Sequence, residues 1–531
     1  MTMPNRPTGP SVIPQPVTMT VQQGTFTITP STSIVVQGDK DFALAADFLA
    51  ARFAVVVGNE STAGQKSAEN AIVIRADAAL GEEAYALQIS EQKVAISAST
   101  GRGAFWGVQS LLQLLPPEVY GELLVDEGEL SVPCVSIEDK PRFAWRGLML
   151  DVARHFASAD EVKRFIDLLA LHKMNVFHWH LTEDQGWRIE IKKYPKLATE
   201  ASVRQDELVG HFRDEPRKFK GEAYGPFCYS QAEIREVVEY ARRRFITIVP
   251  EIELPGHSMA AIHAYPELSC TGEKIPVRVE WGISEDAYCA GKESTFSFLE
   301  DVLAEVCELF PGSYLHIGGD ECRKSRWKAC PDCQQRIQDE QLQDEKELQS
   351  YVIRRIEKFL NGKGKTLIGW DEILEGGLAP HAAVMSWRGE KGGIAAVRAA
   401  HDAVMSPTTH CYLDYRQATE GEPLAIGGHL PLCTVYSYDP VPAELTPAEA
   451  THIMGVQGNV WTEYMPDFEH MLYMTYPRGC AIAEVGWSPL AAKDFQDFYE
   501  TRLPQQLKRF DAMHANYRRL KGDESVLKKL S

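Results

Sequence analysis

The feature that most constrains this chain is an alternation of short apolar runs with amphipathic helical patterns, from Phe143 to about residue 490. Ser158-x-x-Glu161 and Ser230-x-x-Glu233 have the form of capping boxes, which begin helices. The apolar runs cover residues 148–152, 175–181, 245–252, 314–318, 366–370, 383–387, 403–406 and 454–461. Eight buried strands that alternate with helices are typical of a (β/α)₈ TIM barrel. We therefore predict an α/β protein whose barrel spans residues 141–490.

The remaining sequence predicts three smaller parts. Residues 1–18 contain five prolines and predict a flexible N-terminal arm. Residues 19–140 alternate in polarity, with a hairpin pattern at 85–97 and helical patterns at 42–53 and 103–115, and predict an α+β accessory domain. The charged residues 491–531 predict a C-terminal helical segment that packs on the barrel.

Composition narrows the function classes. The chain has 531 residues, 44% hydrophobic and 24% charged, as in globular proteins, and its formal net charge is −19. This charge disfavours nucleic acid and anionic membrane surfaces as partners, and no apolar run is long enough to predict membrane insertion. The N-terminus lacks the pattern of a signal peptide, which favours a cytoplasmic protein but leaves open a secreted form whose leader has been removed. The sequence indicates no oligomeric state.

The cysteines do not form a recognisable disulfide framework. Eleven cysteines are spread over the chain, and Cys322, Cys330 and Cys333 form a local cluster with one C-x-x-C motif. A zinc knuckle requires a fourth ligand that the sequence does not place. We therefore predict free thiols or one loop disulfide here, and no metal.

Polar and aromatic side chains follow the predicted strands, where the site of such a barrel is built. Aromatic rings stack on the apolar faces of sugars, and carboxylates and arginine bind the hydroxyl groups, so the set predicts a carbohydrate pocket. The residues at or after the strand ends are Arg154, His155, His178, His180, Glu183, Asp184, Glu251, Glu253, His257, Asp320, Glu321, Trp370, Asp371, Glu372, Trp387, Arg388, Tyr412, Asp414, Trp461, Thr462 and Glu463.

The pair Asp320-Glu321 follows Gly318 and Gly319 at the end of the fourth strand. Two glycines remove side-chain bulk where another group must approach the backbone closely. Consecutive residues of a regular strand face opposite sides, so the chain must bend near Asp320 if both carboxylates are to reach one ligand.

Two alternatives remain at this level. His178 and His180 lie on the same side of one strand and, with Asp320 and His257, would suit a metal-dependent hydrolase. The same pocket could also belong to an amino-sugar-binding protein without catalysis. The adjacent Asp and Glu favour catalysis over binding alone, and the tryptophans that end the fifth and sixth strands disfavour a metal.

Six motifs together resemble the family-20 glycoside hydrolases, the β-N-acetylhexosaminidases. They are LDVARHF at 150–156, FHWHLTEDQGWR at 177–188, PEIELPGH at 250–257, HIGGDE at 316–321, GWDE at 369–372 and WTE at 461–463. The motifs occur in order through the whole barrel, and the preceding α+β region resembles the family's usual companion domain.

The resemblance implies an exo-acting, retaining enzyme that removes terminal β-linked N-acetylglucosamine or N-acetylgalactosamine without a cofactor or metal. Retaining enzymes of this family use the substrate's own acetamido oxygen as nucleophile, through an oxazolinium intermediate. Glu321 would protonate the leaving oxygen and then activate water. Asp320 would orient the acetamido group and stabilise its developing charge. These roles require a neutral Glu321 beside an ionised Asp320.

Further roles are implied in the same way. Arg154 would bind the 3- and 4-hydroxyl groups of the sugar, and His257 would lie near the general acid with support from Glu183 or Asp184. The remaining residues would contact the sugar: Trp370, Trp387 and Trp461 as walls, Tyr412 as a donor to the acetamido oxygen, and Asp414 and Glu463 as acceptors for the 4- and 6-hydroxyl groups. The resemblance leaves the sugar epimer and the aglycone open, with chitooligosaccharide, glycan and glycolipid among the candidates.

Overall fold

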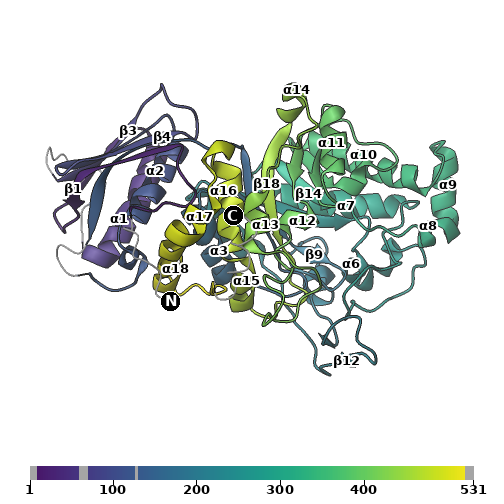
Figure 1. The fold of residues 1–531 in the computed structure, drawn as a ribbon. Coiled ribbons are helices and arrows are strands. Elements are labelled where there is room, and N and C mark those ends of the chain that lie inside the picture. The colour runs from purple at the N-terminus through teal and green to yellow at the C-terminus, as the bar shows by residue number, and fades with distance from the viewer. Residues whose placement is uncertain (1–8, 59–69, 126–129, 521–531) are drawn as a thin grey trace.

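A closed barrel of eight parallel strands forms the larger part of the molecule (Figure 1). The computed structural model describes residues 9–58, 70–125 and 130–520. The strands, in their order around the barrel, are β13 (Thr247–Leu254), β14 (Tyr314–Gly318), β15 (Thr366–Trp370), β16 (Ala383–Ser386), β17 (Ala403–Met405), β18 (Ile453–Val460), β7 (Trp145–Asp151) and β8 (Val176–His180). All eight predicted strands are therefore present, and the predicted (β/α)₈ fold is confirmed.

Helices surround the barrel between successive strands. Ser158 and Ser230 each form a capping box at the start of a helix, as predicted. The longer outer helices are α3 (Ala159–Leu171), α5 (Gln231–Arg242), α7 (Glu293–Leu309), α10 (Glu345–Gly362), α11 (Lys391–Arg398), α15 (Phe468–Thr475) and α16 (Arg478–Trp487). The sequence predicted one helix around residues 470–484, but Pro477 separates α15 from α16 because proline has no N–H for the helical ladder.

The long connections lie at the carboxyl ends of β8, β13, β14 and β17, where they enclose the mouth of the barrel. Besides the outer helices α5, α7 and α10, they contain these short helices and strands: β9 (Thr182–Glu183), β10 (Gly186–Trp187), α4 (Lys196–Thr199), β11 (Leu208–Val209), β12 (Lys218–Phe219), α6 (Met259–Ala264), α8 (Ser325–Ala329), α9 (Pro331–Asp339), α12 (Thr408–Cys411), α13 (Leu432–Ser437) and α14 (Pro447–Ala450). Within the described ranges, no helix combines the length and the hydropathy that crossing a membrane requires.

The accessory domain is a six-stranded mixed sheet with two helices packed against it. Its strand order is β1 (Thr18–Thr27), β6 (Ser131–Asp139), β4 (Tyr85–Ile89), β5 (Lys93–Ala98), β3 (Ala71–Ala76) and β2 (Ser33–Gln37). The β4–β5 hairpin and the helices α1 (Lys40–Val57) and α2 (Gly101–Leu114) agree with the predicted patterns. Nearly all residues of α2 are buried, because this helix lies between the sheet and the rest of the molecule.

The N-terminal segment is packed rather than free. Val12 and Ile13 are fully buried, and the backbone of Ile13 exchanges two hydrogen bonds of 2.8 Å with the side chain of Gln113. The hydroxyl of Ser488 donates to the carbonyl of Gln15 at 2.7 Å. The prediction of a flexible arm is therefore wrong for residues 11–16, whose apolar side chains fill the junction of the two domains. Residues 1–8 of the predicted arm lie outside the described residues.

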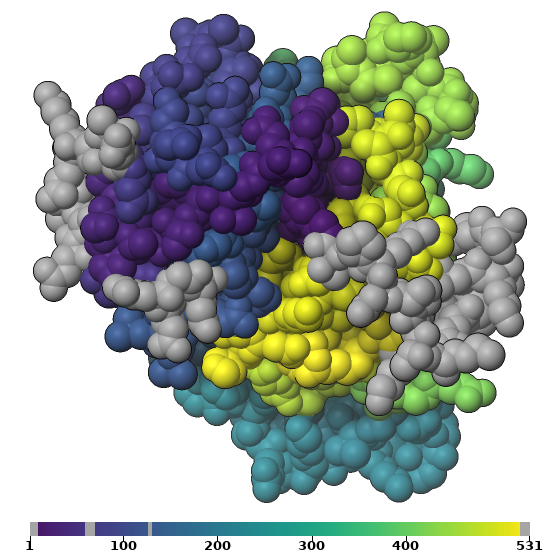
Figure 2. Space-filling view, turned by 60° about the vertical axis from the view of Figure 1, so that its left-hand side comes forward, coloured from purple at the N-terminus to yellow at the C-terminus, as the bar shows by residue number. Residues whose placement is uncertain are grey.

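The C-terminal segment lies beside this N-terminal segment and between the domains (Figures 1 and 2). It contains α17 (Phe495–Asp497), the π-helical turn Phe498–Arg502 and α18 (Leu503–Ala512). Arg502 forms an ion pair of 2.7 Å with Glu484 of α16, and Arg509 donates to the carbonyls of Ser11 and Gln113. The predicted helical segment thus contacts the accessory domain as well as the barrel, and its residues 521–531 lie outside the described part.

One carboxylate, that of Asp139 at the end of β6, joins three parts of the chain. It accepts hydrogen bonds from the backbone of Val17 at 3.0 Å, the indole of Trp487 at 2.9 Å and the hydroxyl of Tyr85 at 2.6 Å. The ammonium of Lys173, which follows α3, lies 2.9 Å from the same carboxylate, and both side chains are fully buried. A buried charge requires such partners, so this cluster fixes the accessory domain on the barrel.

We predict that Lys173→Met lowers the stability of the protein strongly, by about 3–5 kcal/mol, because it leaves the Asp139 carboxylate buried without its cation. The measurement is the shift of the urea unfolding midpoint. Lys193→Met is the matched control, since Lys193 pairs with Asp301 at 2.5 Å while its side chain is 58% exposed. It should cost no more than about 1 kcal/mol. Equal shifts for the two variants would show that the buried pair does not join the domains.

Candidate active site

A cavity of about 510 Å³ opens at the carboxyl ends of the barrel strands. Ten of the twelve predicted site residues line it: Arg154, Glu183, His257, Asp320, Glu321, Trp387, Tyr412, Asp414, Trp461 and Glu463. The other two, Asp184 and Trp370, are buried next to lining residues but are not part of the wall. The strand ends therefore converge on one site, as their positions in the sequence predicted.

The chain bends sharply after β14. Gly318, Gly319 and Glu321 have φ angles of 66°, 91° and 47°, all in the left-handed region. A side chain at Gly318 would meet the carboxyl group of Glu253 at 1.7 Å, so glycine is required there. The bend turns both Asp320 and Glu321 toward the cavity, as two carboxylates acting on one ligand require.

Asp320 and Glu321 differ in their depth. The side chain of Asp320 is 12% exposed and that of Glu321 is 32% exposed, so Glu321 lies nearer the mouth. Nε2 of His257 lies 3.6 Å from a carboxylate oxygen of each. Burial and then the neighbouring charge of Asp320 raise the pKa of Glu321 to about 7. Glu321 can therefore carry a proton at neutral pH, as a general acid must.

His257 is held by Glu183 rather than by Asp184. Its Nδ1 lies 2.6 Å from Oε1 of Glu183 and 3.7 Å from Oδ2 of Asp184. Burial alone would lower the pKa of His257, but Glu183 and Asp320 together raise it well above its usual value. Asp184 instead accepts a hydrogen bond of 3.1 Å from the backbone of Met259, which fixes the loop after β13.

The guanidinium of Arg154 is fixed on three sides and free on one. It donates to Gln185 at 3.1 Å, pairs with Asp151 at 3.2 Å and lies 2.9 Å from Oε2 of Glu183. Arginine has five N–H donors, so these contacts leave two donors at the cavity wall. A rigid pair of donors suits two neighbouring hydroxyl groups of a ligand.

Aromatic rings form one side of the cavity. Trp387 and Tyr412 are stacked with centroids 6.1 Å apart, and Tyr412 lies 6.5 Å from Trp461. Trp370 lies behind Trp461 at 5.8 Å and donates its indole N–H to Glu251 at 2.9 Å. Trp370 thus supports the wall from below, whereas the other three rings contact the cavity directly.

Among the residues that line the cavity, two carboxylate oxygens are buried and, within the described ranges, have no hydrogen-bond partner. They are Oδ1 of Asp320 and Oδ1 of Asp414. Burial and then the charge of Glu463 raise the pKa of Asp414 well above its usual value. An unpaired buried acceptor costs free energy, so each of these atoms is a binding point for a polar group of a ligand.

Beneath the cavity, the carboxylate of Glu251 binds the two histidines that suggested a metal. Its Oε2 lies 2.9 Å from Nε2 of His178 and 2.6 Å from Nδ1 of His180, and its Oε1 lies 2.8 Å from Nδ1 of His316. The donor atoms of these residues lie within coordination distance of one another, as they also do around His257. In the described structure, however, they already serve as partners for each other in a fully buried network.

The two histidines have opposite charge states. Burial lowers the pKa of His178 to about 4 against the attraction of Glu251, and Gln457 lies 2.9 Å from its other ring nitrogen. Burial acts in the same direction on His180, but Glu251 and Glu183 together raise its pKa to about 10. The raised pKa favours a protonated His180, whose charge balances those of the two buried carboxylates.

Several functional contacts were not predicted from the sequence. Gln185 orients Arg154, and Glu372 accepts the indole N–H of Trp387 at 2.8 Å. Gln185 and Glu372 lie inside two of the recognised motifs, directly after Asp184 and Asp371. These positions were the only indication in the sequence that the two side chains contact site residues. Phe212 and Ile283 line the cavity from the long loops after β8 and β13, where no periodic pattern indicates which residue faces the site.

Two family models match the chain. "Glycosyl hydrolase family 20, catalytic domain" covers residues 143–490, and "Glycosyl hydrolase family 20, domain 2" covers residues 9–140. A β-hexosaminidase of Porphyromonas gingivalis is 48% identical over 524 residues, which are 97% of this chain and 65% of that relative. The chain thus spans less than two thirds of that protein's length.

Solved structures are similar to the whole chain. The exo β-N-acetylglucosaminidase of Vibrio harveyi, in complex with N-acetylglucosamine, has a TM-score of 0.84 and 32% identity, and the match covers 98% of this chain and 80% of that one. The N-acetyl-β-hexosaminidase of Streptomyces plicatus, in complex with Thio-NAglucal, has a TM-score of 0.84 and 33% identity over 97% and 98% of the two chains.

We predict that at about pH 7.5 His180 is protonated while His178 is neutral, because their pKa values lie on opposite sides of that pH. Nitrogen NMR of protein labelled on the imidazole rings measures this, with His178→Gln and His180→Gln providing the assignments. A metal bound by both rings would require both to be neutral. A neutral His180 would therefore contradict the network and favour the metal-dependent alternative.

Proposed function

The chain belongs to glycosyl hydrolase family 20, and we propose that it is an exo-acting, retaining β-N-acetylhexosaminidase that works by substrate-assisted catalysis. The observation that carries this proposal is the different placement of two adjacent carboxyl groups. Asp320 is deep in the cavity with an unpaired oxygen, and Glu321 is nearer the mouth with a pKa raised to about 7. Glu321 therefore fits a general acid, and Asp320 beside it fits a group that orients a nucleophile supplied by the substrate itself.

In the first step, Glu321 donates its proton to the glycosidic oxygen as the bond to the anomeric carbon breaks. The acetamido oxygen of the sugar attacks that carbon and forms a cyclic oxazolinium ion. Asp320 accepts a hydrogen bond from the acetamido N–H. Its negative charge stabilises the ring more strongly as the ring becomes cationic. A nucleophile held within the substrate needs no protein counterpart, since positioning alone supplies a large part of the acceleration.

In the second step, the carboxylate of Glu321 takes a proton from water, which attacks the anomeric carbon from the side of the departed group. The acetamido group is restored, and the product retains the β configuration. His257, protonated and held by Glu183, lies 3.6 Å from both carboxylates and stabilises their charge between the steps. Two displacements at one carbon account for retention.

The cavity supports recognition of a single terminal sugar. Trp387, Tyr412 and Trp461 would enclose the ring and the acetamido group, while Arg154 and Asp414 would bind hydroxyl groups. The Vibrio harveyi structure, which holds N-acetylglucosamine, supports the same substrate class for this chain. Phe212 and Ile283 lie on the wall where a leaving group would emerge, so the loops that carry them would select the aglycone.

The experiment that tests substrate assistance uses a thiazoline analogue of the cyclic intermediate. We expect competitive inhibition, and we expect Asp320→Asn to weaken it about 10²-fold, because the variant loses the charge that stabilises the cyclic cation. Inhibition by free N-acetylglucosamine, which is uncharged at that group, should change by less than about tenfold. Equal changes for the two ligands would contradict the role of Asp320, and absence of thiazoline binding would contradict the mechanism.

The loss of kcat/KM caused by Glu321→Gln should depend on the leaving group of the substrate. With a substrate whose leaving oxygen needs a proton, kcat/KM should fall about 10²–10⁴-fold. With an activated aryl N-acetyl-β-glucosaminide the loss should be much smaller, because that leaving group departs unprotonated. Equal losses on both substrates would refute the general-acid role. A protein that binds the sugar but does not hydrolyse either substrate would be the non-catalytic alternative.

The pH dependence follows from the same carboxyl group. Because the pKa of Glu321 is raised to about 7, the acid stays protonated below that pH, and kcat/KM should fall as the pH rises through it. Glu372→Gln is the matched control, since burial and Asp320 also raise the pKa of Glu372, to about 8. Its variant should keep the limb near pH 7, whereas Glu321→Gln should remove it. If only the Glu372→Gln variant lost the limb, the titrating group would be Glu372, and the assignment to Glu321 would be wrong.

A further inference from the structure

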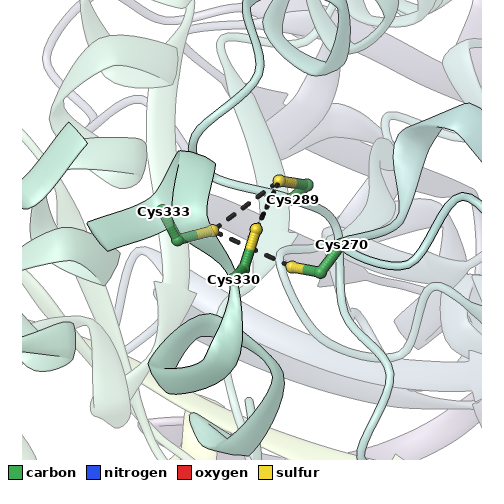
Figure 3. Close-up of side chains that lie close together, drawn as sticks. All are labelled: Cys270, Cys289, Cys330 and Cys333. Carbon is green, nitrogen blue, oxygen red and sulfur yellow. Dashed lines mark hydrogen bonds between the residues drawn. The ribbon is translucent and has the colours of Figure 1, made fainter. Parts of the chain in front are cut away.

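Four cysteines from two of the long barrel loops meet in the folded chain (Figure 3). The sulfur atoms of Cys270, Cys289, Cys330 and Cys333 all lie within 4.8 Å of one another. The sulfur of Cys270 lies 3.8 Å from that of Cys333, and the sulfur of Cys289 lies 3.7 Å from that of Cys330 and 3.6 Å from that of Cys333. The first two come from the loop after β13, and the C-x-x-C pair comes from the start of α9 after β14.

These separations have a specific chemical meaning. A disulfide joins two sulfurs at about 2.05 Å, and none of the four cysteines is bonded in this way. Four thiolates around a tetrahedral zinc ion at about 2.3 Å each have sulfur atoms about 3.8 Å apart. The observed distances match the edges of that tetrahedron, and three of the four residues are buried away from solvent.

The surroundings favour thiolates at this place. Cys330 occupies the N-cap of α9 and Cys333 its first turn, where the helix carries a partial positive charge. Lys292 donates to the carbonyl of Ser269 at 2.7 Å, and Arg336 donates to that of Gly291 at 3.2 Å. Both cations therefore contact the backbone next to the cysteines, and Arg336 also pairs with Glu293 and Glu340.

The backbone around the cysteines is closely fitted. The backbone N–H of Cys289 donates to the carbonyl of Leu268 at 2.8 Å, which holds the two parts of the β13 loop together. A side chain at Gly291 would meet the backbone of Asp332 at 2.2 Å, so this loop touches the C-x-x-C turn directly. The four sulfurs thus converge from segments already held by main-chain contacts, as a preformed metal site requires.

From this geometry we infer that Cys270, Cys289, Cys330 and Cys333 bind one structural zinc ion. Four thiols lose four protons as the ion binds, and no coordination position remains open for a reaction. The sequence placed no fourth ligand beside the C-x-x-C motif, whereas the fold brings Cys270 and Cys289 to it. Cys322, the third member of the sequence cluster, lies outside the group.

The ion would join the two loops that carry the catalytic groups. The loop after β13 contains His257, and the loop after β14 contains Asp320 and Glu321. Gly256 already packs against the backbone of Asp320, where an added side chain would lie 3.1 Å from its carbonyl oxygen. A zinc tetrathiolate at the outer ends of both loops would keep this contact in place.

The test is the metal content of the full chain, purified from zinc-containing medium without a metal-chelate column. We expect about one zinc per chain, all eleven thiols open to alkylation after denaturation with a chelator, and no disulfide. Cys289→Ser and Cys333→Ser should lower the zinc content at least about fivefold. Cys307→Ser, which changes a half-buried thiol on α7 outside the group, should leave it unchanged.

A second measurement applies if the serine variants do not fold. Wild-type protein produced with Co²⁺ should show the visible absorption of tetrahedral thiolate-bound cobalt, which zinc then displaces. Wild-type protein that holds no stoichiometric metal after addition of Zn²⁺ would overturn the inference, as would a disulfide among the four cysteines or unchanged zinc in both variants. These readouts are independent of glycosidase activity, so they remain decisive whether or not the proposed function holds.

Discussion

The catalytic end of this molecule depends on one buried carboxylate, that of Glu183. Three cations share it: Arg154 at 2.9 Å, His180 at 3.4 Å and His257 at 2.6 Å. Burial would raise the pKa of Glu183, but Arg154 and His257 hold it well below its usual value. Each partner comes from a different strand or loop, so the ion-pair geometry sets their relative positions. Arg154 and His257, which line the cavity, are therefore placed by a single anion.

This carboxylate belongs to a longer chain of alternating charges. Glu251 lies below His180, and Asp320 and Glu321 lie above His257, so charge alternates from the barrel interior to the mouth of the cavity. Such a buried network is stable only when every member has its partner. At the mouth end of this series, burial and the neighbouring charge of Asp320 raise the pKa of Glu321 to about 7, which favours its neutral form below that pH.

The fold and most of the site could be predicted from the sequence because both follow from local patterns. Apolar runs of strand length located all eight barrel strands, and the rule that parallel strands present their carboxyl ends together located ten of the cavity residues. The failures share one physical cause. Val12 and Ile13 lie in a proline-rich segment, and Cys270 and Cys289 lie in an irregular loop. Their partners are distant in the sequence, so no periodicity marks them.

The packing of the chain's two terminal segments between the domains has a consequence for biosynthesis. Arg509 binds the carbonyls of Ser11 and Gln113, and Asp139 binds Trp487, so the contacts that join accessory domain and barrel depend on residues that are made long after the accessory sheet. The accessory sheet can form early on the ribosome, because its strands lie within residues 18–139. The accessory sheet can pack fully on the barrel only after α18 has been synthesised. Until then, Val12, Ile13 and α2 lack some of the partners that bury them in the folded chain.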